Sequence, residues 1–453
     1  MRGRLDWAGN RECDWSFLSH EVTYFKGLGI TKEDLTDEGV PVISYGQIHA
    51  KSNDGVHLRR DLLRYIPRTL TNGNEACRLR RGDIVFADTS EDIEGAGNCI
   101  LIDTDDEVYA GYHTLVARPK NQNSGAYLAR LFQSAAWRSQ IQSRICGIKV
   151  FSITRKILKG VSVLTPTEES QRKIVTYLDE KTAAIDARVA VLEKKLSAYK
   201  RLKASVINRA VTRGLDPKAK LKDSGVEWIG KVPAGWEVRN LSQCFGFFKG
   251  LAITKADLTE TGIPVISYGQ IHSKLNIGTH LKPELLRHVP EAITAADPNS
   301  RLKVGDIVFA DTSEDVEGCG NCVLMDAGAP VYAGYHAIVA RPDESQRSRY
   351  FSYLFNASCW RSQIRSKVAG IKVFSITQRI FKGVSLLLPS ITDANAIADY
   401  LDAECAKIDK MAELVTREIE LYKRLKRSLI NEVVTGKRPV FADKPLRRGK
   451  EVA

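Results

Sequence analysis

The chain contains an internal repeat of domain size. Residues 26–212 recur without a gap 223 positions later, at residues 249–435, and 100 of the 187 aligned positions are identical. The run PVISYGQIH, for example, stands at both Pro41–His49 and Pro264–His272. Because this period is far longer than the unit of a solenoid or a propeller, each copy should be a domain in itself. The sequence therefore predicts one fold used twice, with two copies of one binding task.

The composition is that of an ordinary globular protein with an excess of positive charge. Of 453 residues 43% are apolar and 27% charged, and 67 lysines and arginines against 54 aspartates and glutamates give a net charge of +13. This excess favours a polyanionic partner, with nucleic acid ahead of a membrane surface. No apolar run is long enough for a membrane span, and the start MRGRLDWAGN lacks the apolar segment of a secretory signal. The nine scattered cysteines are typical of reduced thiols, so we expect a cytoplasmic protein.

The first part of each copy is expected to be a mixed α/β domain. Short β-rich runs at Val40–Ser44, Asp83–Ala87, Cys99–Ile102 and Leu115–Ala117 are separated by glycines and prolines. One helical stretch is predicted inside the domain, near Tyr127–Arg144 and at the equivalent residues of the second copy.

The second part of each copy is predicted to be one long helix. Apolar residues recur in alternating steps of four and three over residues 168–211, a heptad stripe that needs a partner helix. The other copy offers that partner, so we expect an antiparallel coiled coil of helices roughly 65 Å long. Packing of each helix on its own domain is the less favoured alternative, because a core-facing helix usually has a wider apolar face. The predicted seam consists of Leu178, Ile185, Leu192, Tyr199, Leu401, Ile408, Val415 and Tyr422.

These patterns divide the chain into six segments. They are a first α/β domain at 1–165, a first long helix at 166–212, a linker at 213–238, a second α/β domain at 239–388, a second long helix at 389–435 and a basic tail at 436–453. Thr167 and Ser390 stand at expected N-cap positions, and Ser390 with Asp393 forms a capping-box-like pair. Trp228 and Trp236 predict an ordered linker, whereas the tail is expected to be disordered.

One acidic run invites an enzymatic interpretation. Asp88–Asp92, repeated as Asp311–Asp315, lies about twenty residues before His113 and its counterpart His336. Carboxylates with histidine can hold a divalent metal, so a duplicated metal-dependent hydrolase is one alternative. No second histidine has metal-ligand spacing, the CxxC at Cys319–Cys322 lacks its first thiol in the other copy, and no phosphate-binding loop occurs. We therefore expect no metal site and no catalytic residues.

Residues suited to nucleic-acid binding are better represented. Tyr45, Gln47 and His49 alternate just beyond a predicted strand, so their side chains are expected on one face. Glutamine can bond adenine bidentately and lysine can bond guanine, while Arg138, next to Trp137, could hold the backbone from a helix. The candidate DNA-binding residues are Tyr45, Gln47, His49, Arg138, Lys149, Ser152, Thr154, Tyr268, Gln270, His272, Arg361, Lys372, Ser375 and Thr377.

Further motifs carry a family resemblance. The linker segment Lys222–Val238 reads KDSGVEWIG followed by VPAGWEV, and Tyr199–Leu202 (YKRL) precedes Ile207-Asn208 and Val211-Thr212 in the first helix and recurs with them in the second. With two α/β units that each lead into a heptad helix, the chain resembles the specificity subunit of type I restriction-modification systems over nearly its whole length.

The resemblance implies a DNA-recognition role without catalysis. In that family each α/β unit is a target recognition domain that reads one half-site, and the helices space the two domains. It implies double-stranded DNA, two methyltransferase (M) subunits and restriction/translocase (R) subunits as partners, and no membrane. S-adenosylmethionine, ATP and Mg would belong to those partner subunits, with no cofactor bound by this chain.

Two features depart from the family pattern. The start matches residues 224–248 only at Leu18, Ser19 and Phe25, which predicts a differently built edge for the first domain, or a different true start. The two recognition domains are also unusually alike, which predicts an interrupted near-palindromic DNA site with two similar half-sites. A free-standing bipartite DNA-binding regulator remains the other alternative.

Overall fold

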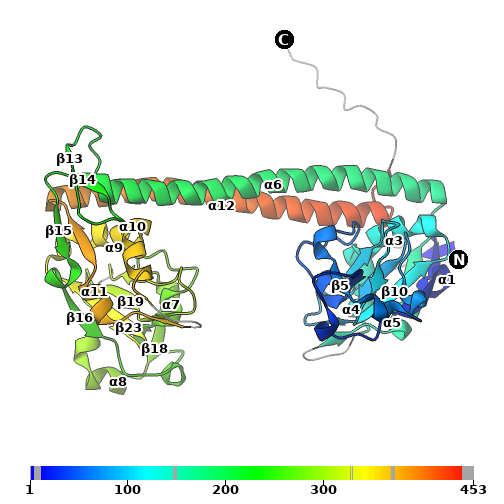
Figure 1. Ribbon diagram of the computed structural model, residues 1–453, viewed down its shortest axis with the longest axis horizontal. Coiled ribbons are helices and arrows are strands. Elements are labelled where there is room, and N and C mark those ends of the chain that lie inside the picture. The colour runs from blue at the N-terminus through cyan, green and yellow to red at the C-terminus, as the bar shows by residue number, and fades with distance from the viewer. Residues whose placement is uncertain are drawn as a thin grey trace, which may run out of the picture. The chain divides into compact units, whose positions relative to one another are not determined.

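The chain forms two compact units, each of which contains one α/β domain and a part of both long helices. Unit 1 comprises Met1–Glu193 and Arg417–Ala453, and unit 2 comprises Lys194–Thr416. The computed structural model (Figure 1) describes residues 2–4, 12–145, 150–326, 328, 330–368 and 373–440. The α/β domains confirm the mixed α/β class, although each compact unit draws helix segments from both copies of the repeat.

In unit 1 the domain is built on a four-stranded antiparallel sheet in the order β3-β10-β6-β8. These strands are β3 Val22–Lys26, β10 Thr114–Pro119, β6 Ile84–Ala87 and β8 Cys99–Leu101. A second sheet consists of β5 Arg64–Ile66, β4 Val40–Ile43 and β9 Tyr109–Ala110, with β4 and β9 parallel. Smaller sheets join β1 Arg2–Arg4, β2 Glu12–Phe17 and β12 Ser162–Leu164, and β7 Thr89–Ser90 with β11 Phe151–Ser152. All four residues of β6 are buried, as expected of a central strand that is covered on both faces.

Unit 2 repeats these main sheets. Its four-stranded sheet has the order β16 Phe245–Lys249, β23 Ala337–Pro342, β19 Ile307–Ala310 and β21 Cys322–Leu324. A second sheet consists of β18 Arg287–Val289, β17 Ile263–Ile266 and β22 Tyr332–Ala333. Two smaller sheets join β20 Thr312–Ser313 with β24 Phe374–Ser375, and β15 Glu237–Asn240 with β25 Ser385–Leu388. A hairpin of β13 Leu221–Asp223 and β14 Lys231–Pro233 lies in the linker.

The edge of the first domain is built differently in one respect, as predicted: among the described residues β1 pairs with β2 as a third strand, and the sheet of β15 and β25 has no such strand. Strand β2 pairs with β12 as β15 pairs with β25. The Leu18 amide donates to the Val161 carbonyl at 2.9 Å, and the Leu241 amide donates to the Val384 carbonyl at 2.8 Å. Backbone hydrogen bonds specify this edge, and they do not require the side chains to be alike.

The helical stretch predicted inside each domain is two helices rather than one. In unit 1 these are α3 Gly125–Phe132 and α4 Ala135–Gln142, and in unit 2 they are α9 Ser348–Asn356 and α10 Ser358–Arg365. The break in unit 1 falls at Ser134, whose hydroxyl accepts from the Trp137 amide at 3.2 Å and so begins a new helix. Short helices complete the domains: α1 Leu18–Glu21, α2 Tyr45–Ile48, α5 Arg155–Lys159, α7 Tyr268–Ile271, α8 Glu291–Ala296 and α11 Gln378–Lys382.

The two long helices are present as predicted: α6 spans Glu168–Arg213 and α12 spans Ile391–Val434. Thr167 and Ser390 cap them, accepting from the Ser170 amide at 3.3 Å and from the Asp393 amide at 3.0 Å. Segments of α6 and α12 lie side by side within each unit (Figure 1).

Ion pairs join the two helices within each unit. Unit 1 has Asp186–Lys426 at 2.6 Å and Arg188–Glu418 at 3.0 Å, and unit 2 has Lys203–Asp409 at 2.6 Å. In unit 1 a later residue of α6 binds an earlier residue of α12, so the two helices run in opposite directions there.

The predicted seam residues are buried or half-buried. Leu178, Ile185, Leu192, Leu401, Ile408 and Val415 are buried, and Tyr199 and Tyr422 are half-buried. Leu178 and Ile185 also belong to one hydrophobic core with Tyr127 and Trp137 of the unit 1 domain. Packing on the helix's own domain, the less favoured alternative, therefore occurs as well at the beginning of α6.

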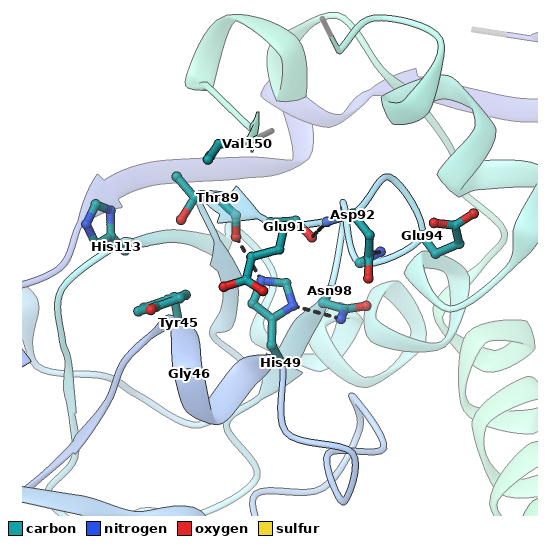
Figure 2. A pocket seen from close by; sticks show the side chains of 12 residues that line it. Tyr45, Gly46, His49, Thr89, Glu91, Asp92, Glu94, Asn98, His113 and Val150 are labelled. Atoms are coloured by element: carbon teal, nitrogen blue, oxygen red, sulfur yellow. Dashed lines mark hydrogen bonds between the residues drawn. The ribbon is translucent and has the colours of Figure 1, made fainter. Parts of the chain in front are cut away.

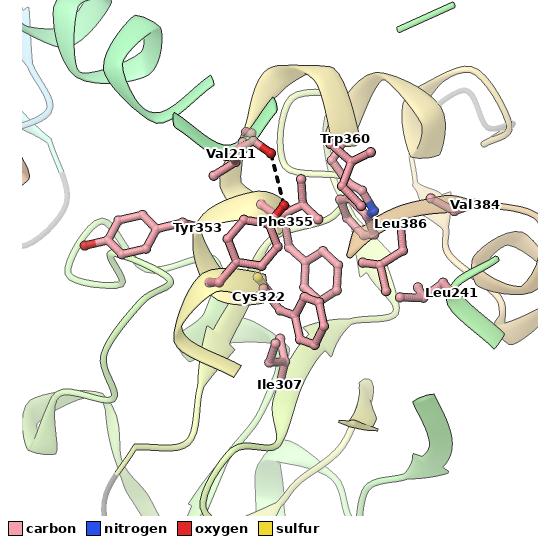
Figure 3. Packing of buried hydrophobic residues seen from close by; sticks show 14 of the residues in the cluster. Val211, Leu241, Ile307, Cys322, Tyr353, Phe355, Trp360, Val384 and Leu386 are labelled. Carbon is pink, nitrogen blue, oxygen red and sulfur yellow. Dashed lines mark hydrogen bonds between the residues drawn. The ribbon is translucent and has the colours of Figure 1, made fainter. Parts of the chain in front are cut away.

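The end of α6 closes the core of the unit 2 domain. Val211 packs in one cluster with Phe355 and Trp360, and the Tyr350 hydroxyl donates to the Val211 carbonyl at 3.0 Å (Figure 3). Helices α9 and α10 lie between the long helices and the four-stranded sheet (Figure 1). Trp236 of the linker is buried in the same core, which agrees with the prediction of an ordered linker. Trp228, the other tryptophan of the linker, is exposed. Residues 441–453 of the tail lie outside the described residues.

Candidate functional site

A pocket of about 830 Å³ opens in unit 1 where β4 and β6 end. Its walls come from α2, from the loop that contains β7, and from the turn before β10 (Figure 2). The lining residues are Tyr45, Gly46, His49, Thr89, Ser90, Glu91, Asp92, Glu94, Gly95, Asn98, His113 and Val150. We call this site the unit 1 pocket.

Unit 2 contains the same pocket with the same residues. It has a volume of about 770 Å³ and is lined by Tyr268, Gly269, His272, Thr312, Ser313, Glu314, Asp315, Glu317, Gly318, Asn321, His336 and Val373. Each of these twelve residues stands 223 positions after its counterpart and is of the same type, although only about half of the repeat is identical. The two pockets therefore offer one set of chemical groups twice.

His49 forms part of the pocket wall, and its hydrogen bonds select one tautomer of the ring. Its Nε2 lies 2.8 Å from the Thr89 carbonyl, and its Nδ1 lies 3.1 Å from the Asn98 side-chain amide. A carbonyl can only accept, so the tautomer that satisfies both contacts carries its proton on Nε2 and accepts at Nδ1. His272 makes the same two contacts, at 2.8 and 3.0 Å. Both ring nitrogens are thus used inside the protein, and the ring serves as a wall.

Further aromatic rings continue the wall beside His49, whose ring centroid lies 6.3 Å from that of Tyr45. The Tyr45 ring packs edge-on against the rings of Tyr112 and His113, both with centroids 5.6 Å away. His113 has a positive φ of 53°, which is uncommon for a residue other than glycine, and its Nδ1 lies 3.2 Å from an Asp88 carboxylate oxygen. His336 repeats this with the same φ. Strain of this kind concentrates at functional sites.

Sequence reasoning missed Tyr112 and Asn98 as parts of the site, together with their counterparts in unit 2. The signal was present in the run VYAGYH, which is identical at Val108–His113 and Val331–His336, and in the repeated GN before Cys99.

One side of the pocket is acidic. Glu91, Asp92 and Glu94 line it, no lysine or arginine among the described residues does, and an Asp92 carboxylate oxygen accepts from the Gly95 amide at 2.5 Å. Within the described ranges Glu91 has no hydrogen-bond or ion-pair partner, nor has its counterpart Glu314. Among the same residues no group of three or more His, Cys, Asp and Glu side chains could hold a metal ion. The metal-dependent hydrolase therefore receives no support from this cluster.

The expected alternation of Tyr45, Gln47 and His49 was wrong. Residues Tyr45–Ile48 form a helical turn instead of continuing the strand, so Tyr45 and His49, four apart, share the pocket face. Gln47 turns back, and its Oε1 accepts from the Ser44 amide at 3.0 Å in a capping box. Tyr268, Gln270 and His272 are arranged in the same way.

The two arginines expected to hold the DNA backbone face the protein. Arg138 donates to the Glu94 carbonyl at 3.2 Å and to the Asn98 side chain, and burial lowers its pKa. Arg361 donates to the Phe355 carbonyl at 3.2 Å and to Asn356 Oδ1 at 2.7 Å, and burial lowers its pKa too. In this structure both side chains hold loops in place from inside.

The remaining candidates are exposed residues outside the pocket lining, or lie outside the described residues. Ser152, Thr154, Ser375 and Thr377 are exposed, and Thr154 also caps α5 by accepting from the Ile157 amide at 3.3 Å. Lys149 and Lys372 lie outside the part of the chain that the structure describes. DNA contact by any of these residues stays a prediction.

Comparison with known proteins gives a consistent family. Residues 233–420 match the family described as type I restriction modification DNA specificity domain. The type I restriction enzyme MjaVIII specificity subunit of Methanocaldococcus jannaschii is 22% identical over 303 residues, 66% of this chain and 67% of that protein. The StySPI specificity subunit of Salmonella potsdam is 22% identical over 446 residues, 96% of this chain and 90% of that protein.

One solved structure, concerned with complex assembly and conformational transition of the type I R-M system, shows the shared fold. Its chain is 16% identical, with a TM-score of 0.67 and coverage of 94% of this chain and 98% of that one. Residues 233–420 thus carry a DNA specificity domain of the type I restriction modification family. The resemblance of the whole chain to specificity subunits of type I restriction enzymes is confirmed.

Proposed function

We propose that this chain is the DNA-recognition subunit of a type I restriction-modification complex, with each unit recognising one half of a bipartite, interrupted site. The observation that carries the proposal is the duplicated pocket, whose twelve lining residues are identical in two α/β domains. The net charge of +13 suits a polyanionic ligand. Since the pockets offer the same groups, the two half-sites should be similar and the whole site nearly palindromic.

The long helices are proposed to pair as an antiparallel coiled coil that spaces the half-sites and binds two methyltransferase subunits and, with them, restriction subunits. Support comes from the helix-to-helix ion pairs within each unit. Apolar side chains are also exposed at equivalent positions of the two helices: Val191 (56%) with Leu414 (55%), and Leu202 (46%) with Leu425 (50%). Exposed apolar patches of this kind mark protein-binding surfaces.

Catalysis is assigned to the partners. S-adenosylmethionine, ATP and Mg would be bound by the methyltransferase and restriction subunits, and this chain would bind none of them. Methylation of a base within a duplex requires the base to leave the stack, a step that belongs to the methyltransferase. A cytoplasmic location follows from this role; no helix in the described part of the chain is both long and apolar enough to cross a membrane.

Methylome sequencing tests the proposal. A host that expresses this chain with its methyltransferase should acquire methylation at a bipartite motif with two similar half-sites, and a strain without this chain should lack it. Two dissimilar half-sites would retain the recognition role and refute the near-palindrome. No new methylation, together with tight sequence-specific DNA binding by the chain alone, would favour the free-standing regulator.

A further inference from the structure

Glu91 in unit 1 and Glu314 in unit 2 are anomalous in a chain that binds a polyanion. Each is an exposed carboxylate that lines its pocket, and each is without a hydrogen-bond or ion-pair partner within the described residues. A carboxylate placed near DNA repels the phosphates and would weaken binding, unless it accepts a hydrogen bond from a base.

The surroundings of Glu91 are those of a base-reading site. Figure 2 shows Tyr45, His49 and Glu91 around one hollow, with His49 held by Thr89 and Asn98. The histidine nitrogens are occupied by these contacts, whereas the Glu91 and Glu94 carboxylates have no partner among the described residues. Of these two, Glu91 is the one that lies next to Tyr45 and His49 (Figure 2). At a volume of about 830 Å³ the pocket has room for the edge of a base pair.

In the major groove, adenine N6 and cytosine N4 are the exocyclic amino donors, whereas guanine O6 and thymine O4 are acceptors. A carboxylate accepts from an amino group and repels a keto oxygen. It can therefore discriminate adenine or cytosine from guanine or thymine at one position.

We propose that Glu91 and Glu314 are specificity-determining residues, each of which accepts a hydrogen bond from the exocyclic amino group of an adenine or a cytosine in its half-site. This inference rests on the proposed function and adds the ligand group that the pocket reads. Because the pockets are identical, both half-sites should carry the same amino-bearing base at the equivalent position.

The test uses the complete complex with its methyltransferase. Methylomes are compared for the wild type, Glu91→Gln, Glu314→Gln and the double variant. Glutamine can donate as well as accept, so Glu91→Gln should admit guanine or thymine at one position of one half-site, with about tenfold or greater loss of discrimination. Glu314→Gln should do the same only in the other half-site, and the base that is replaced shows whether adenine or cytosine is read.

The control is Glu38→Gln, which removes the same charge from an exposed side chain outside the pocket and should leave the motif unchanged. A wild-type motif without a shared amino-bearing base, or unchanged motifs in Glu91→Gln and Glu314→Gln, would overturn this inference and leave the proposed function standing. A wild-type complex that methylates no bipartite site would overturn both.

If Glu91→Gln abolishes methylation, competition binding of the purified complex decides. Oligonucleotides carrying each of the four base pairs at the position are compared for the wild type and the variant. Retained selectivity in the variant would refute the proposal, and lost selectivity with unchanged thermal unfolding of the complex would support it.

Discussion

The two α/β domains agree inside the pocket and differ in a set of exposed ion pairs, which we call the charged ridge. In unit 1 three exposed arginines pair with an acidic segment: Arg60–Asp106 at 3.0 Å, Arg68–Glu107 at 2.9 Å and Arg81–Asp105 at 2.8 Å. The equivalent residues of unit 2 are Pro283, Glu291, Val304, Gly328, Ala329 and Pro330, so neither member of any of these pairs is kept there. The groups that line the pocket are kept, and the charged ridge is exchanged as a set.

The attachment of each domain to its long helix differs in a similar way. Asp179 of α6 and Asp402 of α12 occupy equivalent positions. In unit 1 Asp179 binds the buried guanidinium of Arg130. In unit 2 Asp402 binds Arg349 and the Tyr353 hydroxyl, and His280 lies 3.8 Å away. One carboxylate in the same place thus accepts different donors in the two units.

The largest loss of stability is expected from a buried ion pair that both domains share. Asp83, almost fully buried, accepts from Arg118 at 2.7 and 2.8 Å, and Asp306 accepts from Arg341 at the same distances. Removal of a partner from a buried ion pair costs about 3–5 kcal/mol. Asp83→Ala and Asp306→Ala should therefore destabilise their own units equally, as measured by hydrogen exchange of β6 or β19 under increasing urea. A difference above about 1 kcal/mol would mean that the two cores are not equivalent.

Substitution of Asp179 or Asp402, which attach the domains to the long helices, should lower the stability by smaller and unequal amounts. Asp179→Ala leaves the buried Arg130 charge with only Gln133 as a described partner, at an expected cost of about 3 kcal/mol. Asp402→Ala should cost about 2 kcal/mol because its arginine partner is 43% exposed. Adding Arg130→Met to Asp179→Ala should restore most of the stability, since no buried charge remains. Urea denaturation of the four proteins measures this, and no recovery in the double variant would contradict the explanation.

Much of this fold could be predicted from the sequence, because it rests on features that repeat or are periodic. The heptad stripe indicated both long helices, and β-rich runs located β4, β6, β8 and β10. The break between α3 and α4 was missed, since Ser134 lies within an otherwise helical pattern and acts by capping. The pairing of β2 with β12 was not predicted, because it depends on backbone hydrogen bonds.

The site was predicted in part, and the errors have physical causes. The sequence indicated Tyr45, His49 and the acidic run, and the pocket is lined by Tyr45, His49 and residues 89–92 of that run. It gave no indication that Gln47 would cap its own turn or that Arg138 would face inward, because both depend on which backbone groups need a partner. Partners far apart along the chain, such as His49 and Asn98, meet only through the fold.

The pH dependence of stability should distinguish the two attachments. The hydrogen bond to Asp326 and the nearby carboxylate of Asp402 raise the pKa of His280 to about 9, above its ordinary value of 6.5. A raised pKa stabilises the folded state fully below pH 6.5, and this stabilisation is lost as the pH rises through about 9. Since His280 is 45% exposed, we expect unit 2 to lose about 1 kcal/mol or less over this range.

The variant His280→Gln should remove this dependence, which is measured by urea denaturation of unit 2 at several pH values between 6 and 10. The matched variant His57→Gln, whose residue pairs with Asp103 at 3.3 Å, should leave the dependence in place. If the two variants had the same pH dependence of stability, Asp402 would not be the cause of the difference in pH dependence between the units.

The smallest effect on stability, and the most informative for recognition, concerns the charged ridge of unit 1. Its ion pairs are exposed, so removing either side should leave unfolding nearly unchanged. If the ridge faces the DNA backbone, the two sides should act in opposite directions on binding. Replacing Arg60, Arg68 and Arg81 by alanine should weaken binding and lower the salt slope by about 0.9 for each phosphate that an arginine no longer neutralises. Replacing Asp105, Asp106 and Glu107 by alanine frees the arginines and should strengthen binding with a steeper slope. Salt titrations of both triple variants in the methyltransferase complex measure this. If both triple variants change the affinity in the same direction, the ridge does not face the DNA. Other residues would then have to account for any difference between the half-sites.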